Sequence, residues 1–297
     1  MGVALVGCAT TDTAPVAAGS SPVQRALVAL SHRSDANSLA TAGLLSRSHH
    51  GDGSLALIRR AAATDPARPD LVWLETLSCE QTSGCDAQSV ELKLRALDPK
   101  NGVGWFGALA RADSRHDREA ANQALRALAA SRRVDIYWNP LVAMLSRAVY
   151  ETKAMSAGEA QVTVIGFLAA EPIPAFRDVA DGCKGEHLKI EGRLVTCRGI
   201  AKALEQGDTY ITAMLGDSIA MRVWPEGSPE WQAAYRSRRT GEYQLELEGR
   251  LDAERSAAPW QYVPLFGQYR REQDVLRARL IQAGLNPDPP SNPAPGN

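Results

Sequence analysis

Residues 98–128 read DPKNGVGWFGALARADSRHDREAANQALRAL, and this stretch decides the fold class. It opens with Asp98-Pro99, where proline cannot continue a preceding helix and aspartate can turn or cap the chain. His116-Asp117 lies in its middle, between two segments rich in alanine and leucine. The second segment carries its apolar side chains at helical spacing, at Ala121, Leu125 and Leu128. The stretch therefore predicts two helices joined by a short turn.

Features of this stretch recur at a nearly constant spacing. Asp65-Pro66 precedes Asp98-Pro99 by 33 residues, and tryptophan occurs at Trp73, Trp105 and Trp138. A period of roughly 33 to 34 residues is typical of helix-turn-helix arrays, in which neighbouring helix pairs bury their apolar faces against each other. We interpret the three tryptophans as core anchors between neighbouring helices.

This region resembles the tetratricopeptide repeat family over about residues 40–150, as three degenerate repeats. The family places an aromatic early in its first helix, here Trp105-Phe106, and small residues where the helices touch, here Gly107, Ala108 and Ala112. The pattern departs from the family at Ser131-Arg132-Arg133, which replaces the Asp-Pro step. The alternative is a helical bundle with accidental spacing. The resemblance implies stacked helix pairs with a groove suited to a protein or peptide.

The first residues contain a second resemblance. Leu5-Val6-Gly7-Cys8 resembles the lipobox of bacterial lipoproteins, in which a small residue precedes a cysteine that receives a diacylglycerol. The resemblance implies lipidation at Cys8, and Ala9 in place of aspartate implies the outer membrane, facing the periplasm. The match lacks the basic start and full apolar run of a signal peptide, which a start upstream of Met1 would explain. The alternative is an ordinary cysteine in an unstructured N-terminus, and residues 9–22 predict a flexible linker.

Four further cysteines remain: Cys79, Cys85, Cys183 and Cys197. An even number in an exported protein suggests two disulfides, although four cysteines allow three connectivities. We favour the local pairs Cys79–Cys85 and Cys183–Cys197, because each pair brackets a short polar segment. Zinc is the rival ligand, but zinc sites usually have closer cysteine pairs or nearby histidines. No metal site is predicted.

The sequence predicts four parts. Residues 1–22 form the lipid-attachment site and linker, 23–150 the repeat-like region, 151–285 further packed helices and 286–297 a disordered, proline-rich tail. In the third part, Ser228-Pro229 predicts a helix start. The alternation from Tyr243 to Leu251 and the β-branched run from Val162 to Ile165 are strand-like. The prediction is an all-α fold, with an α+β second half as the runner-up.

Composition and motifs limit the function. The chain has 33 basic and 34 acidic residues, a balance that argues against nucleic-acid binding, which needs a basic field. No common catalytic or nucleotide-binding motif is present, so no catalytic residue and no cofactor are predicted. We expect a non-catalytic, lipid-anchored protein of the cell envelope that binds a protein or peptide. The alternative is an envelope enzyme with its active site within residues 151–285.

Overall fold

The computed structural model describes residues 20–47, 53–171, 175–254 and 263–290. Within these ranges the regular structure is helical throughout, with fifteen α-helices, two short 3-10 helices and no strand. The all-α prediction is confirmed, and the α+β alternative is wrong for the described residues. Both strand-like segments are helical: Val162 to Ile165 lie in α9 (Ala157–Ala169), and Tyr243 to Leu251 lie in α13 (Pro229–Glu254).

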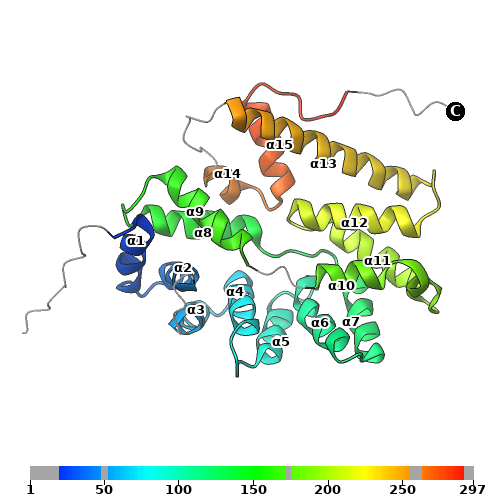
Figure 1. The fold of residues 1–297 in the computed structure, drawn as a ribbon, viewed down its shortest axis with the longest axis horizontal. Coiled ribbons are helices and arrows are strands. Elements are labelled where there is room, and N and C mark those ends of the chain that lie inside the picture. Colours follow the sequence, from blue (N-terminus) through cyan, green and yellow to red (C-terminus); the bar gives the residue numbers. More distant parts are fainter. Residues whose placement is uncertain (1–19, 48–52, 172–174, 255–262, 291–297) are drawn as a thin grey trace, which may run out of the picture.

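The first half of the chain forms a row of helices, each in contact with the next (Figure 1). In order these are α1 (Pro22–Ser31), α2 (Ala36–Ser46), α3 (Gly53–Thr64), α4 (Pro69–Glu80), α5 (Ala87–Leu97), α6 (Phe106–Ser114) and α7 (Arg118–Ala130), with the 3-10 helix η2 (Gly102–Trp105) before α6. This arrangement is consistent with the predicted helical array. The two helices predicted within residues 98–128 are α6 and α7.

Local signals explain where these helices begin. Asp35, Asp86 and Asp117 each cap a helix, because each carboxylate accepts a hydrogen bond from a backbone N–H three residues later. Ser21 forms a capping box with Gln24 at the start of α1, so the predicted linker ends just before Pro22. The helices before Asp65 and Asp98 end at the residue preceding each aspartate.

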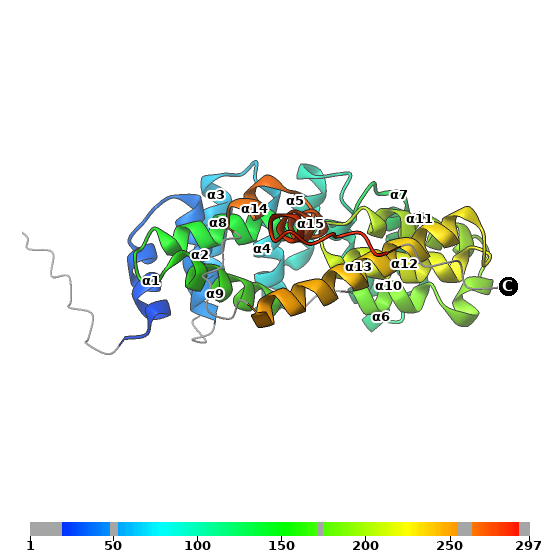
Figure 2. The ribbon, with the colours of Figure 1, turned by 90° about the horizontal axis from the view of Figure 1, so that it is seen from above.

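The second half packs back onto this row (Figures 1 and 2). Its remaining helices are α8 (Trp138–Tyr150), α10 (Phe176–Gly182), η3 (Gly185–Lys189), α11 (Arg193–Glu205), α12 (Tyr210–Val223), α14 (Val263–Gln268) and α15 (Glu272–Gln282). Helix α8 returns to α1 and α2 at one end of the row, and α11 packs on α7 at the other. Helix α13 then lies against α12 and α15.

One apolar core runs through both halves. Its buried members extend along the chain from Ala26 to Val275. Helix α4 is buried along its length, since every residue from Asp70 to Cys79 is inaccessible to solvent or nearly so. The core continues across residues 150/151, because α9 packs on α8 and α11 packs on α7.

The tryptophans occupy different positions relative to this core. Trp73 is buried in α4, whereas Trp105 and Trp138 are only partly buried against the core. The guanidinium of Arg95 stacks over the Trp105 ring, 3.8 Å from its centroid. The fully buried aromatic of that repeat is the adjacent Phe106, whose ring meets Phe176 of α10 edge-on.

Part of the proline-rich tail is attached to the second half. Gln244 Nε2 donates to the carbonyl oxygen of Pro287 over 3.1 Å, and Arg277 donates twice to the carboxylate of Asp288, over 2.7 and 3.0 Å. These bonds connect the start of the predicted disordered tail to α13 and α15. Residues 291–297 lie outside the described part of the chain.

Candidate functional site

A pocket of about 270 Å³ lies among α12, α13 and the start of α15, helices that lie together in Figures 1 and 2. Its lining comes from three segments. Helix α12 supplies Tyr210, Ala213, Met214 and Asp217; α13 supplies Ser237, Thr240, Gly241 and Gln244; and Arg271, Gln273, Asp274 and Arg277 complete it. A single water needs only roughly 10–15 Å³ of such space, so the pocket can hold a small molecule.

Backbone contacts fix the two helix starts that form the pocket. The N–H of Tyr210, at the start of α12, donates to Glu272 Oε2 over 2.8 Å. The N–H of Glu272, at the start of α15, donates to the carbonyl oxygen of Asp208 over 2.7 Å. These reciprocal bonds hold the first turns of α12 and α15 together.

Close packing also fixes the position of Asp217. A Cβ added to Gly216 would lie 2.6 Å from the backbone nitrogen of Glu205, so only glycine lets α12 approach α11 this closely. On the α13 side, the Tyr210 hydroxyl donates to Gln244 Oε1 over 2.7 Å, and both side chains are buried. The walls of the pocket are therefore tied to α11, α13 and the tail.

Three buried polar atoms of the lining form no hydrogen bond with any described residue. They are Asp217 Oδ1, Arg271 Nε and Gln273 Oε1. The other end of two of these side chains is anchored, because Arg271 Nη2 donates to the Glu205 carbonyl and Gln273 Nε2 to the Thr209 carbonyl. Leaving a buried polar group unsatisfied costs roughly 1–3 kcal/mol. All three atoms are shielded from solvent, as are the other unsatisfied atoms of the described residues.

The pocket has an unusual carboxyl group at Asp217, which is only 2% exposed. Burial, and to a lesser extent the nearby carboxylate of Glu205, raise the pKa of Asp217 to about 7, against the opposing effects of a hydrogen bond with Ser237 and of the charges of Arg238 and Arg271. At neutral pH this carboxyl is poised between its protonated and ionised forms. It can therefore either donate or accept a hydrogen bond.

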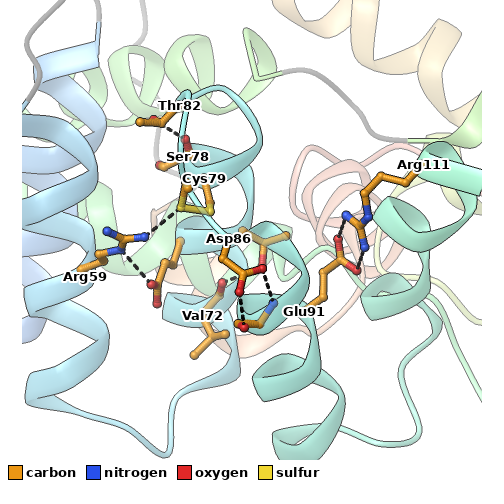
Figure 3. The surroundings of a disulfide bond; sticks show 12 residues. Arg59, Val72, Ser78, Cys79, Thr82, Asp86, Glu91 and Arg111 are labelled. Carbon is orange, nitrogen blue, oxygen red and sulfur yellow. Dashed lines mark hydrogen bonds and ion pairs between the residues drawn. A yellow bond between two sulfur atoms is a disulfide. The ribbon is translucent and has the colours of Figure 1, made fainter. Parts of the chain in front are cut away.

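Both predicted disulfides are present. Cys79–Cys85 joins the end of α4 to the loop before α5, and Cys183–Cys197 joins the end of α10 to α11. Figure 3 shows the first, with Arg59 Nη2 donating to Cys85 Sγ over 2.8 Å. Cys183 and Cys197 are completely buried. The two crosslinks lie away from the pocket.

A buried ion pair lies close to the first disulfide (Figure 3). Glu91 is 1% exposed and accepts two hydrogen bonds from Arg111, over 2.5 and 2.7 Å, and one from Arg95, over 3.1 Å. The carboxyl of Glu80 lies beside that of Glu91. One oxygen of each lies next to the Cα of Gly107, where an added Cβ would clash with both. Glu80 is exposed as a whole residue, but desolvation of its carboxyl beside Glu91, and then the charge of Glu91, raise its pKa to about 7.

The remaining expectations concern lipidation, metal binding and membrane-spanning helices. Cys8 and residues 1–19 are outside the described part of the chain. Among the described residues, no group of His, Cys, Asp and Glu side chains could hold a metal ion. No helix in the described ranges is long and apolar enough to cross a membrane.

Sequence reasoning missed the pocket, because its residues form no motif. One signal was present: Asp217 interrupts the apolar run from Ile211 to Val223, and a charged side chain on a buried helix face calls for a partner. Comparisons with protein-family models, with curated proteins and with solved structures find no match for this chain.

Proposed function

We propose that this protein is a non-catalytic binding protein of the bacterial cell envelope, anchored by a lipid at Cys8, and that its ligand occupies the pocket among α12, α13 and α15. One observation carries the proposal: polar side chains of α12, α13 and α15, including Asp217, Gln244 and Gln273, line a single pocket of about 270 Å³. The two disulfides support an oxidising compartment such as the envelope.

The position of the ligand differs from the groove that a helical array suggests. Helices α8 and α11 lie on α2 and α7, so the chain's own second half occupies part of that surface. The pocket in the second half is lined by polar side chains instead. A small polar molecule is the occupant that suits its volume. A protein or peptide partner for the array remains a separate prediction.

A specific observation favours a second candidate, an envelope enzyme whose active site is the same pocket. A carboxyl group with a pKa near 7 can act as a general acid or base at neutral pH, and burial gives Asp217 this property. Its neighbour Tyr210 is a poor second group, since its hydroxyl donates to Gln244 and burial raises its pKa well above the ordinary value. Binding is therefore the better supported function.

The test uses full-length protein purified from its native envelope. The protein is denatured, and the small molecules that it releases are identified by mass spectrometry. Gly241→Leu fills the pocket, because a Cβ at Gly241 already contacts the Tyr210 ring at 3.4 Å. Gly249→Leu is the matched control on the same helix, since a Cβ there meets nothing within 4 Å.

We expect the wild-type protein and Gly249→Leu to release a compound that Gly241→Leu lacks, with Asp217→Asn reducing its amount. Identical profiles from all variants would overturn the proposal. If the purified wild-type protein converts the recovered compound into a product and Asp217→Asn does not, the enzyme replaces the binding protein.

A further inference from the structure

A second pocket, of about 250 Å³, lies among α5, α6 and α7, consecutive helices of the first half (Figure 1). It shares no lining residue with the pocket of the proposed function, so the two sites are independent. No carboxylate of the described residues lines it. Its polar lining consists of three arginines and two glutamines, namely Arg95, Arg111, Arg115, Gln88 and Gln123. This composition favours an anionic ligand.

One buried carboxylate compensates part of this positive charge. Glu91 lies beside the lining and accepts hydrogen bonds from Arg95 and Arg111, the second of which is drawn in Figure 3. Arg115 is exposed, and its side chain pairs with no carboxylate in the described ranges. Three guanidinium groups against one carboxylate leave two positive charges at the pocket.

Two further carboxylates lie near Arg111 without lining the pocket. The charges of Glu80 and Asp86 both act on Arg111. The Asp86 carboxylate is exposed and caps α5 by accepting from Ser89, and water and salt screen an exposed charge. Glu80, with its pKa raised to about 7, is partly neutral at neutral pH. The pocket therefore keeps its positive character.

The arginines have donors that their internal bonds do not use. Arg95 donates through Nε to the Gly104 carbonyl and through Nη2 to Glu91, so Nη1 has no partner among the described residues. Arg111 donates to Glu91 through both Nη atoms, which leaves Nε. The side chains of Arg95 and Arg111 are 17% and 32% exposed, so a ligand can reach them. The planar guanidinium group matches the geometry of a carboxylate.

The rest of the lining is apolar. It consists of the Trp105 ring, on which Arg95 stacks, and of the methyl groups of Ala108, Ala120 and Ala124. The pocket is also much larger than a compact ion needs, because one water needs only roughly 10–15 Å³ of such space. An anion with a short hydrocarbon body therefore suits the pocket better than an inorganic ion.

We propose that this pocket binds a small dicarboxylate. One carboxylate accepts hydrogen bonds from Arg95 and Arg111, the other accepts from Arg115, and the hydrocarbon chain between them lies against the alanines. The two negative charges of the ligand neutralise the two positive charges of the pocket. Charge-assisted hydrogen bonds of this kind are about twice as strong as neutral ones.

Four probes separate this ligand class from its neighbours. Glutarate carries two carboxylates, and pentanoate has the same number of carbons with one carboxylate. 1,5-Pentanediol keeps the chain without charge, and sulfate is a dianion without a hydrocarbon body. Binding to the full chain is measured by isothermal titration calorimetry at pH 7 and constant ionic strength.

We expect glutarate to bind at least tenfold more tightly than each of the other three probes. Arg115→Gln removes a positive charge without breaking an ion pair of the described residues, and it should weaken glutarate binding at least tenfold. Gln123→Glu places a carboxylate in the lining and should have the same effect. Arg118→Gln is the matched control, because Arg118 is also exposed but lies outside the pocket. Arg118→Gln and Gly241→Leu should both bind glutarate like the wild type.

Three results would overturn the proposal. If pentanoate or sulfate binds as tightly as glutarate, the pocket does not recognise a dicarboxylate. If no probe binds, the pocket has no such ligand. If Arg115→Gln and Gln123→Glu bind like the wild type, or if Gly241→Leu loses glutarate binding, the dicarboxylate occupies another site, and only the last of these outcomes concerns the pocket of the proposed function.

Discussion

The neighbouring glutamates Glu80 and Glu91 should respond in opposite ways to the same substitution. Glu91 is the buried partner of two arginines, which donate three hydrogen bonds to it. Glu91→Gln removes the charge that separates Arg95 from Arg111 and leaves two cations facing a neutral amide. Breaking a buried ion pair costs about 3–5 kcal/mol.

The structure places the expected cost at the lower end of that range. The side chains of Arg95 and Arg111 are 17% and 32% exposed, so water can partly solvate both guanidinium groups after the substitution. We therefore expect Glu91→Gln to lower the free energy of unfolding by about 3 kcal/mol. That is a large share of the roughly 5–15 kcal/mol that stabilises a typical domain.

Glu80→Gln is the matched control. The raised pKa of Glu80 means that its ionised form is disfavoured in the folded protein, because its carboxyl is partly desolvated where it lies beside Glu91 and is repelled by the charge of Glu91, although the residue as a whole is exposed. Replacing it with neutral glutamine at pH 8 should leave stability unchanged or increase it. Urea unfolding followed by circular dichroism measures both variants, and a shift in midpoint at constant slope reports stability. Equal losses in the two variants would refute the assigned roles of these carboxyl groups.

Four further predictions concern crosslinking, pH, packing and anchoring. Replacing Cys183 and Cys197 together by alanine should lower the free energy of unfolding by about 3 kcal/mol. The same change at Cys79 and Cys85 should cost about 2 kcal/mol, because that pair closes a shorter loop. Urea unfolding that gives the reverse order would contradict this. The pKa of Asp217 is about 7 in the folded protein and 3.8 ordinarily, so the folded state binds the proton more tightly than the unfolded state. The free energy of unfolding should therefore fall as the pH rises from about 4 to about 7, by up to about 1.4 kcal/mol per pH unit. Asp217→Asn should flatten that slope, and an unchanged slope would show that Asp217 titrates normally. Gly216→Ala should destabilise the protein by about 1–3 kcal/mol, because its Cβ would clash with α11. Gly249→Ala, at an exposed position of α13, should stabilise it by about 0.5–1 kcal/mol. Thermal melting shifts of the same sign for both variants would be inconsistent with this packing. Finally, the protein expressed from its natural start should fractionate with membranes, and Cys8→Ser should release the protein or block its processing. A Cys8→Ser protein that stays in the membrane fraction with unchanged electrophoretic mobility would exclude lipid attachment at Cys8.

Local features of the chain could be predicted from its sequence because they depend on short-range chemistry. The Asp-Pro steps and the capping aspartates end and begin helices through contacts within a few residues. The pairing of Cys79 with Cys85 followed from the short polar segment between them. Each of these features needs only the neighbouring backbone.

Long-range features could not be predicted in the same way. Nothing within α8 indicates that it returns to α2, because that contact depends on the path of the whole chain. The choice between Trp105 and Phe106 as the buried aromatic depends on η2, which sets the rotation at the start of α6. The pocket likewise requires α12, α13 and α15 to meet, although Asp217 and Gln244 are distinctive as polar side chains on buried helix faces.

The most direct test of the central claim is a crystal structure of the full-length protein purified from its native envelope, without added ligand. We expect electron density for a bound small molecule in the pocket, within hydrogen-bonding distance of polar side chains that line it, such as Asp217, Gln244 or Arg271. A pocket that contains only water, or one in which Asp217 and Arg271 pair directly with each other, would contradict the account.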